Sequence, residues 1–125
     1  MNIAAKLDDL RMLAPNCDLV GFGDLRAQII LRTSSNRKSP QEYLDEICRQ
    51  ARQGFAAQDI LARIDGHKPE LHNSLVTLAG GETRIMVRTN RDADDMLFCV
   101  CRTPDVAWGL ETRMHITLQD ICGSN

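Results

Sequence analysis

Residues 96–101, MLFCVC, are apolar at every position, and this run constrains the fold more than any other in the chain. Successive side chains of a β-strand face opposite sides, so both faces of this run would be apolar. Such a strand needs cover on both faces, which places it near the middle of a sheet with helices on each side. The two predicted faces are Met96, Phe98 and Val100, and Leu97, Cys99 and Cys101.

The same run contains two of the five cysteines, so metal or redox chemistry is the alternative interpretation. A metal site needs about four ligands. The remaining cysteine and histidine residues show no C-x-x-C or H-x-x-x-H spacing; they are Cys17, Cys48, Cys122, His67, His72 and His115. Buried free cysteine packs as a small hydrophobe. We therefore expect structural, reduced cysteines and neither a metal nor another cofactor.

Turn and capping signals predict the other elements. Residues 18–25 and 27–33 are β-rich runs and predict a hairpin that turns at Gly23–Asp24. Residues 74–89 predict a second hairpin that turns at Gly80–Gly81. The last helix is expected to open at Thr103–Pro104 and to end at Gly123.

The central helix has the clearest start signal. Ser39 is expected to cap it, Pro40 suits its first position and Glu42 completes a capping box. Behind that signal lies an apolar stripe at helical spacing, made of Leu44, Ile47, Cys48, Ala51 and Phe55. Residues 56–64 either prolong this helix or begin another.

Ile3, Leu7, Leu10 and Ala14 recur at helical spacing and predict a first helix that ends at Pro15. Together these elements predict an α+β fold in the order α-β-β-α-β-β-β-α. The hairpins imply a five-stranded, mostly antiparallel sheet, and the two-sided central strand implies helices on both of its faces. At 125 residues and 43% hydrophobic content the chain is expected to form one domain, residues 1–125.

Charge and motifs exclude several functions. The net charge of −2 predicts no nucleic-acid binding, and no apolar run is long enough for membrane insertion. The start, MNIAAKLDDLRML, is charged from residue 6, so we expect a cytoplasmic protein. No G-x-x-x-x-G-K-[ST] phosphate loop is present. We therefore expect no catalytic residues and no enzymatic activity.

Two arginines in the run ETRIMVRT remain unusual. Arg84 and Arg88 share one face of the predicted strand with Met86, whereas Ile85 and Val87 share the other. The arginines would either contact a partner or anion, or pair with Asp or Glu side chains of a neighbouring helix. We favour the ion pairs, which are common in proteins.

The run SLVTLAG before the second turn contains no charge and no proline. Such a strand is prone to pair with another chain when it lies at an exposed sheet edge. If this run forms an edge strand, we expect a partner to pair with its open side.

The order and length of the elements resemble those of the Roadblock/dynein light chain superfamily. The resembling segments are DLVGFGDLRAQIILRTSS, SPQEYLDEICRQARQGF, SLVTLAGGETRIMVRT and MLFCVCRTPDVAWGLETRM. The resemblance implies a central fifth strand and a third strand at the sheet edge. The stretch from Gly54 to His72 is longer than this family needs, so an additional helix is one expectation there.

The resemblance also implies a homodimer that joins edge strands and packs central helices together. Such proteins are non-catalytic scaffolds or regulators of small GTPases and multiprotein complexes, and some bacterial members stimulate GTP hydrolysis. The expected dimer contacts are Tyr43, Gln50, Leu75, Val76, Thr77 and Leu78. A sensor or ligand-binding domain of profilin-like or longin-like layout is the alternative, and a small thiol or metal enzyme is a third.

Overall fold

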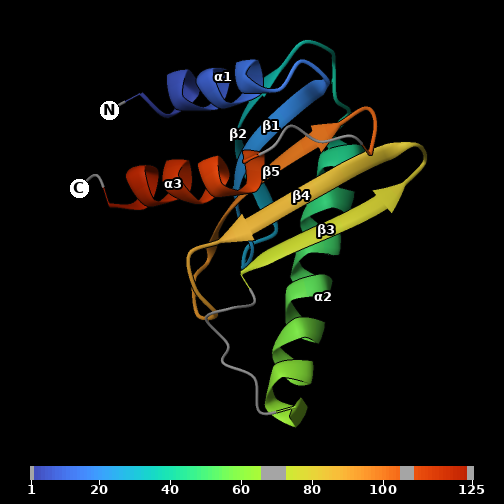
Figure 1. The fold of residues 1–125 in the computed structure, drawn as a ribbon, viewed down its shortest axis with the longest axis vertical. Coiled ribbons are helices and arrows are strands. Elements are labelled where there is room, and N and C mark those ends of the chain that lie inside the picture. Colours follow the sequence, from blue (N-terminus) through green and yellow to red (C-terminus); the bar gives the residue numbers. More distant parts are fainter. Residues whose placement is uncertain (1, 66–72, 105–108, 124–125) are drawn as a thin grey trace.

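A computed structural model describes residues 2–65, 73–104 and 109–123 (Figure 1). The element order is the predicted one, α-β-β-α-β-β-β-α. Its members are α1 (Ile3–Leu13), β1 (Cys17–Asp24), β2 (Ile29–Ser35), α2 (Gln41–Asp65), β3 (Ser74–Ala79), β4 (Glu82–Arg88), β5 (Asp95–Cys101) and α3 (Leu110–Cys122).

The five strands form one sheet in the order β2-β1-β5-β4-β3. Every neighbouring pair is antiparallel. β5 is therefore the central strand, and β2 and β3 are the two edges. Figure 1 shows α1 and α3 side by side on one face of the sheet, while α2 crosses the other face and projects past the end of the strands. The α+β prediction is confirmed.

The alternation predicted for β5 produces two separate cores. The first core lies under α1 and α3, and its β5 members are Leu97, Cys99 and Cys101. The second core lies under α2, and its β5 members are Met96, Phe98 and Val100. All six side chains are at most 1% exposed. Burial on both faces explains why this strand carries no polar residue after its first position.

A glycine in β1 makes room for the largest side chain of β5. Gly21 is the cross-strand partner of Phe98, and a Cβ atom at this position would overlap the ring of Phe98. The ring therefore lies directly over the β1 backbone, an approach that a larger residue at position 21 would prevent.

The first hairpin turns later than the sequence predicted. β1 continues to pair with β5 up to Asp24, which lies opposite Asp95, so Gly23–Asp24 is still strand and the turn falls at residues 25–28. Asp24 Oδ1 accepts a hydrogen bond from the backbone N–H of Ala27 at 2.9 Å, and Gln28 adopts a φ of 57°. The predicted turn position is wrong because pairing with the central strand extends β1.

The start of α2 also differs from its prediction. The carbonyl of Pro40 accepts the first helical hydrogen bonds, from Tyr43 N at 3.0 Å and Leu44 N at 3.2 Å. Ser39 Oγ is buried and has no hydrogen-bond partner in the described residues, so it does not cap the helix. α2 then runs without interruption to Asp65. Residues 56–64 therefore prolong this helix, and they do not form an additional one.

The last helix begins at Leu110, after Gly109 at a φ of 82°. Thr103 and Pro104 precede it by several residues and do not open it, since Thr103 Oγ1 instead accepts a hydrogen bond from Asn16 Nδ2 at 2.7 Å. Residues 105–108 lie outside the described part of the chain. The predicted end is confirmed, because the N–H of Gly123 donates to the carbonyl of Gln119.

We predict that the double substitution Cys99→Ala and Cys101→Ala lowers the free energy of unfolding by about 1–3 kcal/mol, because it removes buried volume from the first core. Urea denaturation followed by circular dichroism measures this difference. Cys122→Ala is the matched control, since Cys122 is only partly buried and should cost less. Stoichiometric zinc that is present in the wild type and lost from the double variant would contradict the structural role.

Candidate protein-interaction site

β3 is the most exposed strand of the second hairpin. It pairs with β4 from Ser74↔Val87 to Ala79↔Glu82, and no described strand pairs with its outer side. Gly80 and Gly81 form the turn at φ values of 59° and 81°, as two-residue hairpin loops require. The predicted turn and the predicted edge position of β3 are both confirmed.

The register shows which backbone groups of β3 point outward. The backbone N–H of Arg88 donates to the carbonyl of Asn73 at 3.0 Å, and hydrogen-bonded pairs alternate along an antiparallel ladder. Thr77 therefore falls in a hydrogen-bonded pair with Arg84. Val76 and Leu78 fall in the alternate pairs, which turns their backbone N–H and C=O groups toward the open side.

The side chains of β3 divide between the two faces of the sheet. Leu75 packs into the second core and rests on α2 at Gly54, where a Cβ atom would overlap it. Val76 and Leu78 face the other side and are 56% and 68% exposed. β3 thus has two exposed apolar side chains, and its outer backbone groups are not paired with any described strand.

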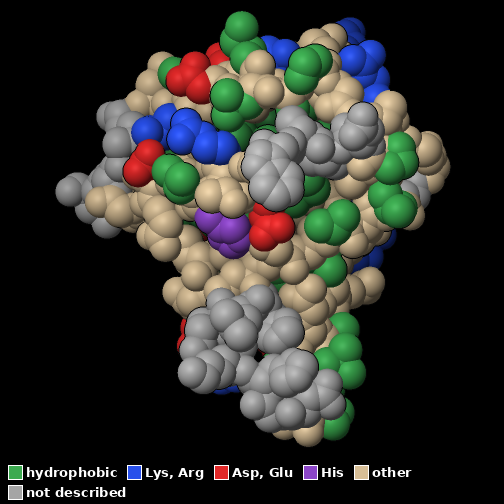
Figure 2. Space-filling model, in the orientation of Figure 1, with side chains coloured by type: hydrophobic (Ala, Val, Ile, Leu, Met, Phe, Trp, Pro, Cys, Tyr) green, Lys and Arg blue, Asp and Glu red, His purple; other side chains and the backbone are tan. Residues whose placement is uncertain are grey.

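A second exposed apolar group lies on the part of α2 that projects past the sheet. Ile60, Leu61 and Ile64 are 52%, 57% and 74% exposed. Figure 2 shows hydrophobic side chains over the β3 edge and again along this end of the helix. The sequence prediction missed this group, because it left open whether residues 56–64 belong to the same helix.

Tyr43 and Gln50, which were predicted to contact a second subunit, both engage their own chain. Tyr43 Oη donates to Glu82 Oε2 at 2.5 Å, and its ring lies near the guanidinium of Arg84 at 5.1 Å. Burial and the hydrogen bond to Glu82 raise the pKa of Tyr43. Gln50 Oε1 accepts hydrogen bonds from Thr77 Oγ1 at 3.2 Å and from Arg84 Nη1 at 3.1 Å. Both side chains therefore hold the second hairpin against α2.

Arg84 is buried and forms ion pairs, as the favoured alternative predicted. It contacts Glu46 of α2 at 3.0 Å and Glu82 of its own strand at 2.9 Å. Burial alone would lower the pKa of Arg84, but the hydrogen bonds to Glu82 and Glu46 outweigh it and the pKa is raised.

Arg88 forms a bidentate pair with Asp59 of α2. The two contacts are 2.6 Å from Nη2 to Oδ1 and 3.1 Å from Nη1 to Oδ2. Its guanidinium also lies 4.4 Å from the ring centre of Phe55. The side chains of Arg84 and Arg88 are only 5% and 3% exposed, so both arginines join β4 to α2.

A polar cluster joins the beginning of β3 to α3, on the sheet face opposite α2. Ser74 Oγ lies 2.8 Å from Glu111 Oε2 and 2.7 Å from His115 Nε2, both on α3. The same imidazole nitrogen is the one nearest to Glu111, at 3.9 Å. A serine–histidine–acid relay needs the carboxylate on the other ring nitrogen, so this arrangement fastens β3 to α3 and does not activate the serine.

The first core contains a third cysteine that the strand pattern did not reveal. Cys17 of β1 lies directly opposite Cys101. Hydrogen bonding to Cys17, together with burial, raises the pKa of both Cys99 and Cys101. The hydrogen bonds to Cys101 and Cys99 lower the pKa of Cys17. The three thiols therefore form one hydrogen-bonded cluster inside the first core. The residues described include no group of three His, Cys, Asp or Glu side chains placed to hold a metal ion.

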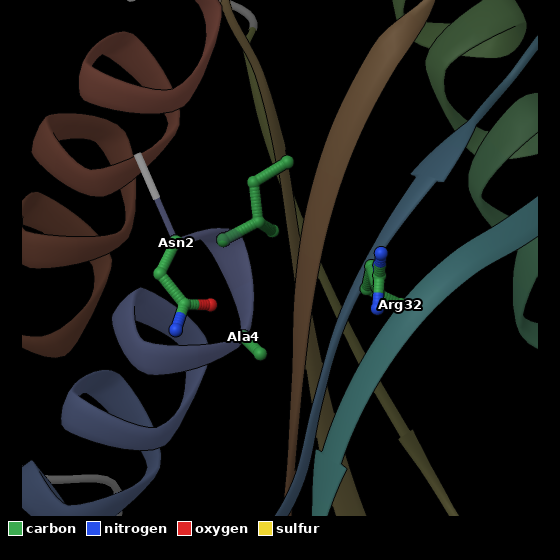
Figure 3. A pocket seen from close by; sticks show the side chains of 4 residues that line it. Asn2, Ala4 and Arg32 are labelled. Carbon is green, nitrogen blue, oxygen red and sulfur yellow. The ribbon is translucent and has the colours of Figure 1, made fainter.

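A small pocket of about 290 Å³ lies between the start of α1 and β2 (Figure 3). Its one charged side chain is Arg32, and Asn2 lies across from it. Asn2 Oδ1 already accepts the N–H of Ala5 at 3.2 Å and caps α1. The pocket is lined by only four residues, so it offers few contacts to a ligand. No helix within the described ranges is long and apolar enough to cross a membrane.

No protein-family model and no curated protein sequence matches this chain. Several solved structures are similar in fold. A Roadblock/LC7 domain from Streptomyces avermitilis superimposes with a TM-score of 0.75 at 8% identity, covering 98% of this chain and 97% of that one. MglB from Myxococcus xanthus gives a TM-score of 0.71 at 16% identity, covering 98% and 96%.

MglC from Myxococcus xanthus gives a TM-score of 0.68 at 11% identity and full coverage of both chains. Identities this low carry information about the fold alone, and coverage is nearly complete in each comparison. The chain therefore has the fold of the Roadblock/LC7 superfamily, as its sequence pattern predicted.

Proposed function

We propose that this protein is a non-catalytic scaffold or regulatory module that works as a homodimer joined through β3. The observation that carries the proposal is the open edge of β3. Its run from Ser74 to Ala79 has no charge and no proline, and two of its apolar side chains are exposed. An edge of this kind pairs readily with another strand.

A two-fold axis at Thr77 fits the register of this edge. Antiparallel pairing about that axis would set Val76 opposite Leu78 of the second copy, and Leu78 opposite Val76. Val76 and Leu78 both have backbone groups that point outward, so both copies would complete their hydrogen bonds at the same positions. A two-fold contact uses one patch twice, and facing apolar side chains add to its stability.

The exposed group on α2 lies next to this edge. Gln58 Nε2 donates to the carbonyl of Ser74 at 2.9 Å, which joins α2 to the start of β3. Ile60, Leu61 and Ile64 follow within two helical turns. We include them in the proposed contact surface together with Leu75, Val76, Thr77 and Leu78, whereas Tyr43 and Gln50 support this surface from within the chain.

The similar structures support a role in protein assembly. One is the gliding protein MglB from Thermus thermophilus, and another is MglB in a tetrameric arrangement. The Roadblock resemblance suggests a small GTPase or another component of a multiprotein complex as the partner. We place this protein in the cytoplasm, where such partners occur, and we assign it no catalytic activity and no cofactor.

We predict that the wild-type protein has a mass of about twice 14.0 kDa in light scattering, because two β3 edges pair. The double substitution Val76→Lys and Leu78→Lys should give a monomer, since charged side chains on an edge oppose pairing. Both side chains are exposed, so the free energy of unfolding should change by only about 0.5 kcal/mol once association is accounted for. Ile116→Lys, at an exposed apolar position on α3, is the matched control and should remain dimeric.

Proline substitutions separate the outer side of β3 from its inner side. Val76→Pro removes an outward N–H and should abolish the dimer while the monomer stays folded. Thr77→Pro removes a donor of the ladder with β4 and should lower the thermal midpoint of the monomer itself. A wild-type monomer at high micromolar concentration would reject the homodimer and leave a different protein as the cover of this edge.

We further predict that the purified protein releases no phosphate from GTP or ATP, because the sequence lacks a phosphate-binding loop. A phosphate-release assay on the protein alone measures this. Adding a small GTPase partner should raise the hydrolysis rate of that partner only. Turnover that stays with this chain through denaturation, refolding and repurification would refute the non-catalytic role.

A further inference from the structure

A charged pocket of about 250 Å³ lies at one end of the sheet. The turn between β1 and β2, the loop between β4 and β5, and the middle of α2 surround it. Segments far apart in the sequence thus meet at this point. We call this site the arginine pocket, because Arg26, Arg52, Arg88 and Arg91 line it.

The inner part of the arginine pocket is apolar and its buried charge is already balanced. Phe55 and Leu25 line it and are 2% and 7% exposed. Arg88 lies over the Phe55 ring and forms its bidentate pair with Asp59. Phe55 and Leu25 therefore form a buried floor, and the accessible hydrocarbon of the pocket comes from Ala56, which is exposed, and Ala93, which is half-buried. The Arg88 cation is already occupied within the chain.

The two loops that form the rim are joined by their backbones. The N–H of Leu25 donates to the carbonyl of Asp94 at 2.6 Å. Arg26 also approaches the Asp94 carboxylate, at 4.0 Å, but its side chain is 83% exposed. At that distance and exposure the ion pair holds Arg26 only weakly, so its guanidinium can turn toward a ligand.

Two further arginines of the rim have no polar partner within the described residues. Arg52 of α2 and Arg91 of the β4–β5 loop are both exposed. The pocket lining carries four arginines and three aspartates, Asp59, Asp92 and Asp94, which gives a formal charge of 4 − 3 = +1. The whole chain has a formal net charge of −2, whereas the lining of this pocket is net positive.

We propose that the arginine pocket binds a single carboxylate group on a short aliphatic stem. One negative charge matches the charge of the lining, and planar guanidinium groups form paired hydrogen bonds with a carboxylate. The stem would lie against Ala56 and Ala93, which also line the pocket. A phosphate dianion fits less well, because Asp92 and Asp94 on the same rim repel a second negative charge.

Two kinds of ligand carry such a carboxylate: a protein partner with a glutamate side chain, and a small free carboxylic acid. NMR titration that follows backbone and arginine Nε–H signals separates them. The probes are butyrate, the capped peptide acetyl-Gly-Glu-Gly-amide and inorganic phosphate, all at one ionic strength because salt screens exposed charges. Butyramide and the matching Gln peptide are the uncharged controls.

We expect saturable shifts at the arginine pocket with butyrate or with the Glu peptide, and none with the uncharged controls. The double substitution Arg52→Gln and Arg91→Gln should weaken this binding by about tenfold or more, since hydrogen bonds to charged groups are lost. Arg32→Gln with Arg113→Gln removes the same number of exposed charges elsewhere and should leave the affinity unchanged.

Each outcome decides the proposal. Equal affinity for butyrate and the Glu peptide supports a free carboxylic acid as the ligand, and tighter binding of the peptide supports a protein partner. Phosphate binding as tightly as the carboxylates overturns the proposal. Shifts that never saturate, or that the control double variant loses equally, show general attraction of anions to arginine and overturn it as well.

Discussion

Burial of β5 on both faces is the constraint on which the rest of this structure depends. A central strand with two apolar faces needs a cover on each, and α1 with α3 supplies one cover while α2 supplies the other. The same requirement sets local details at a distance from β5. Gly21 lacks a side chain where the Phe98 ring lies over β1, and β1 continues to Asp24 because β5 still offers a pairing partner there.

The buried arginines connect this core to the proposed interaction edge. Arg84 and Arg88 lie on the α2 face of β4 and form ion pairs with Glu46 and Asp59 of α2. Desolvation offsets much of the attraction in a buried ion pair, so we assign these pairs a positioning role more than a stabilising one. They set the angle between the second hairpin and α2. The open strand β3 and the exposed part of α2 are thereby held in one arrangement that a symmetric partner can match.

Local signals in the sequence predicted much of the fold and part of the site. The Gly80–Gly81 turn, the alternation of β4 and β5 and the edge position of β3 are confirmed. The predicted starts of the second and third helices are wrong. Proline next to serine or threonine resembles a cap, yet Ser39 Oγ has no partner in the described residues and Thr103 bonds to Asn16. The residue that caps a helix depends on where the preceding strand ends. Local composition does not determine that position.

The sequence by itself determined the period of each element and which side chains share a face, because both follow from the repeat of a strand or helix. Tertiary structure alone decided which of these faces stay open. Tyr43 and Gln50 lie off the helix stripe, yet they bond to residues of the second hairpin, whereas Ile60, Leu61 and Ile64 are exposed because α2 is longer than the sheet beneath it. The arginine pocket likewise arises from two loops and a helix that meet only in the folded chain. The exposure of a side chain depends on contacts between distant segments. The local periodicity of a sequence does not predict where those segments meet.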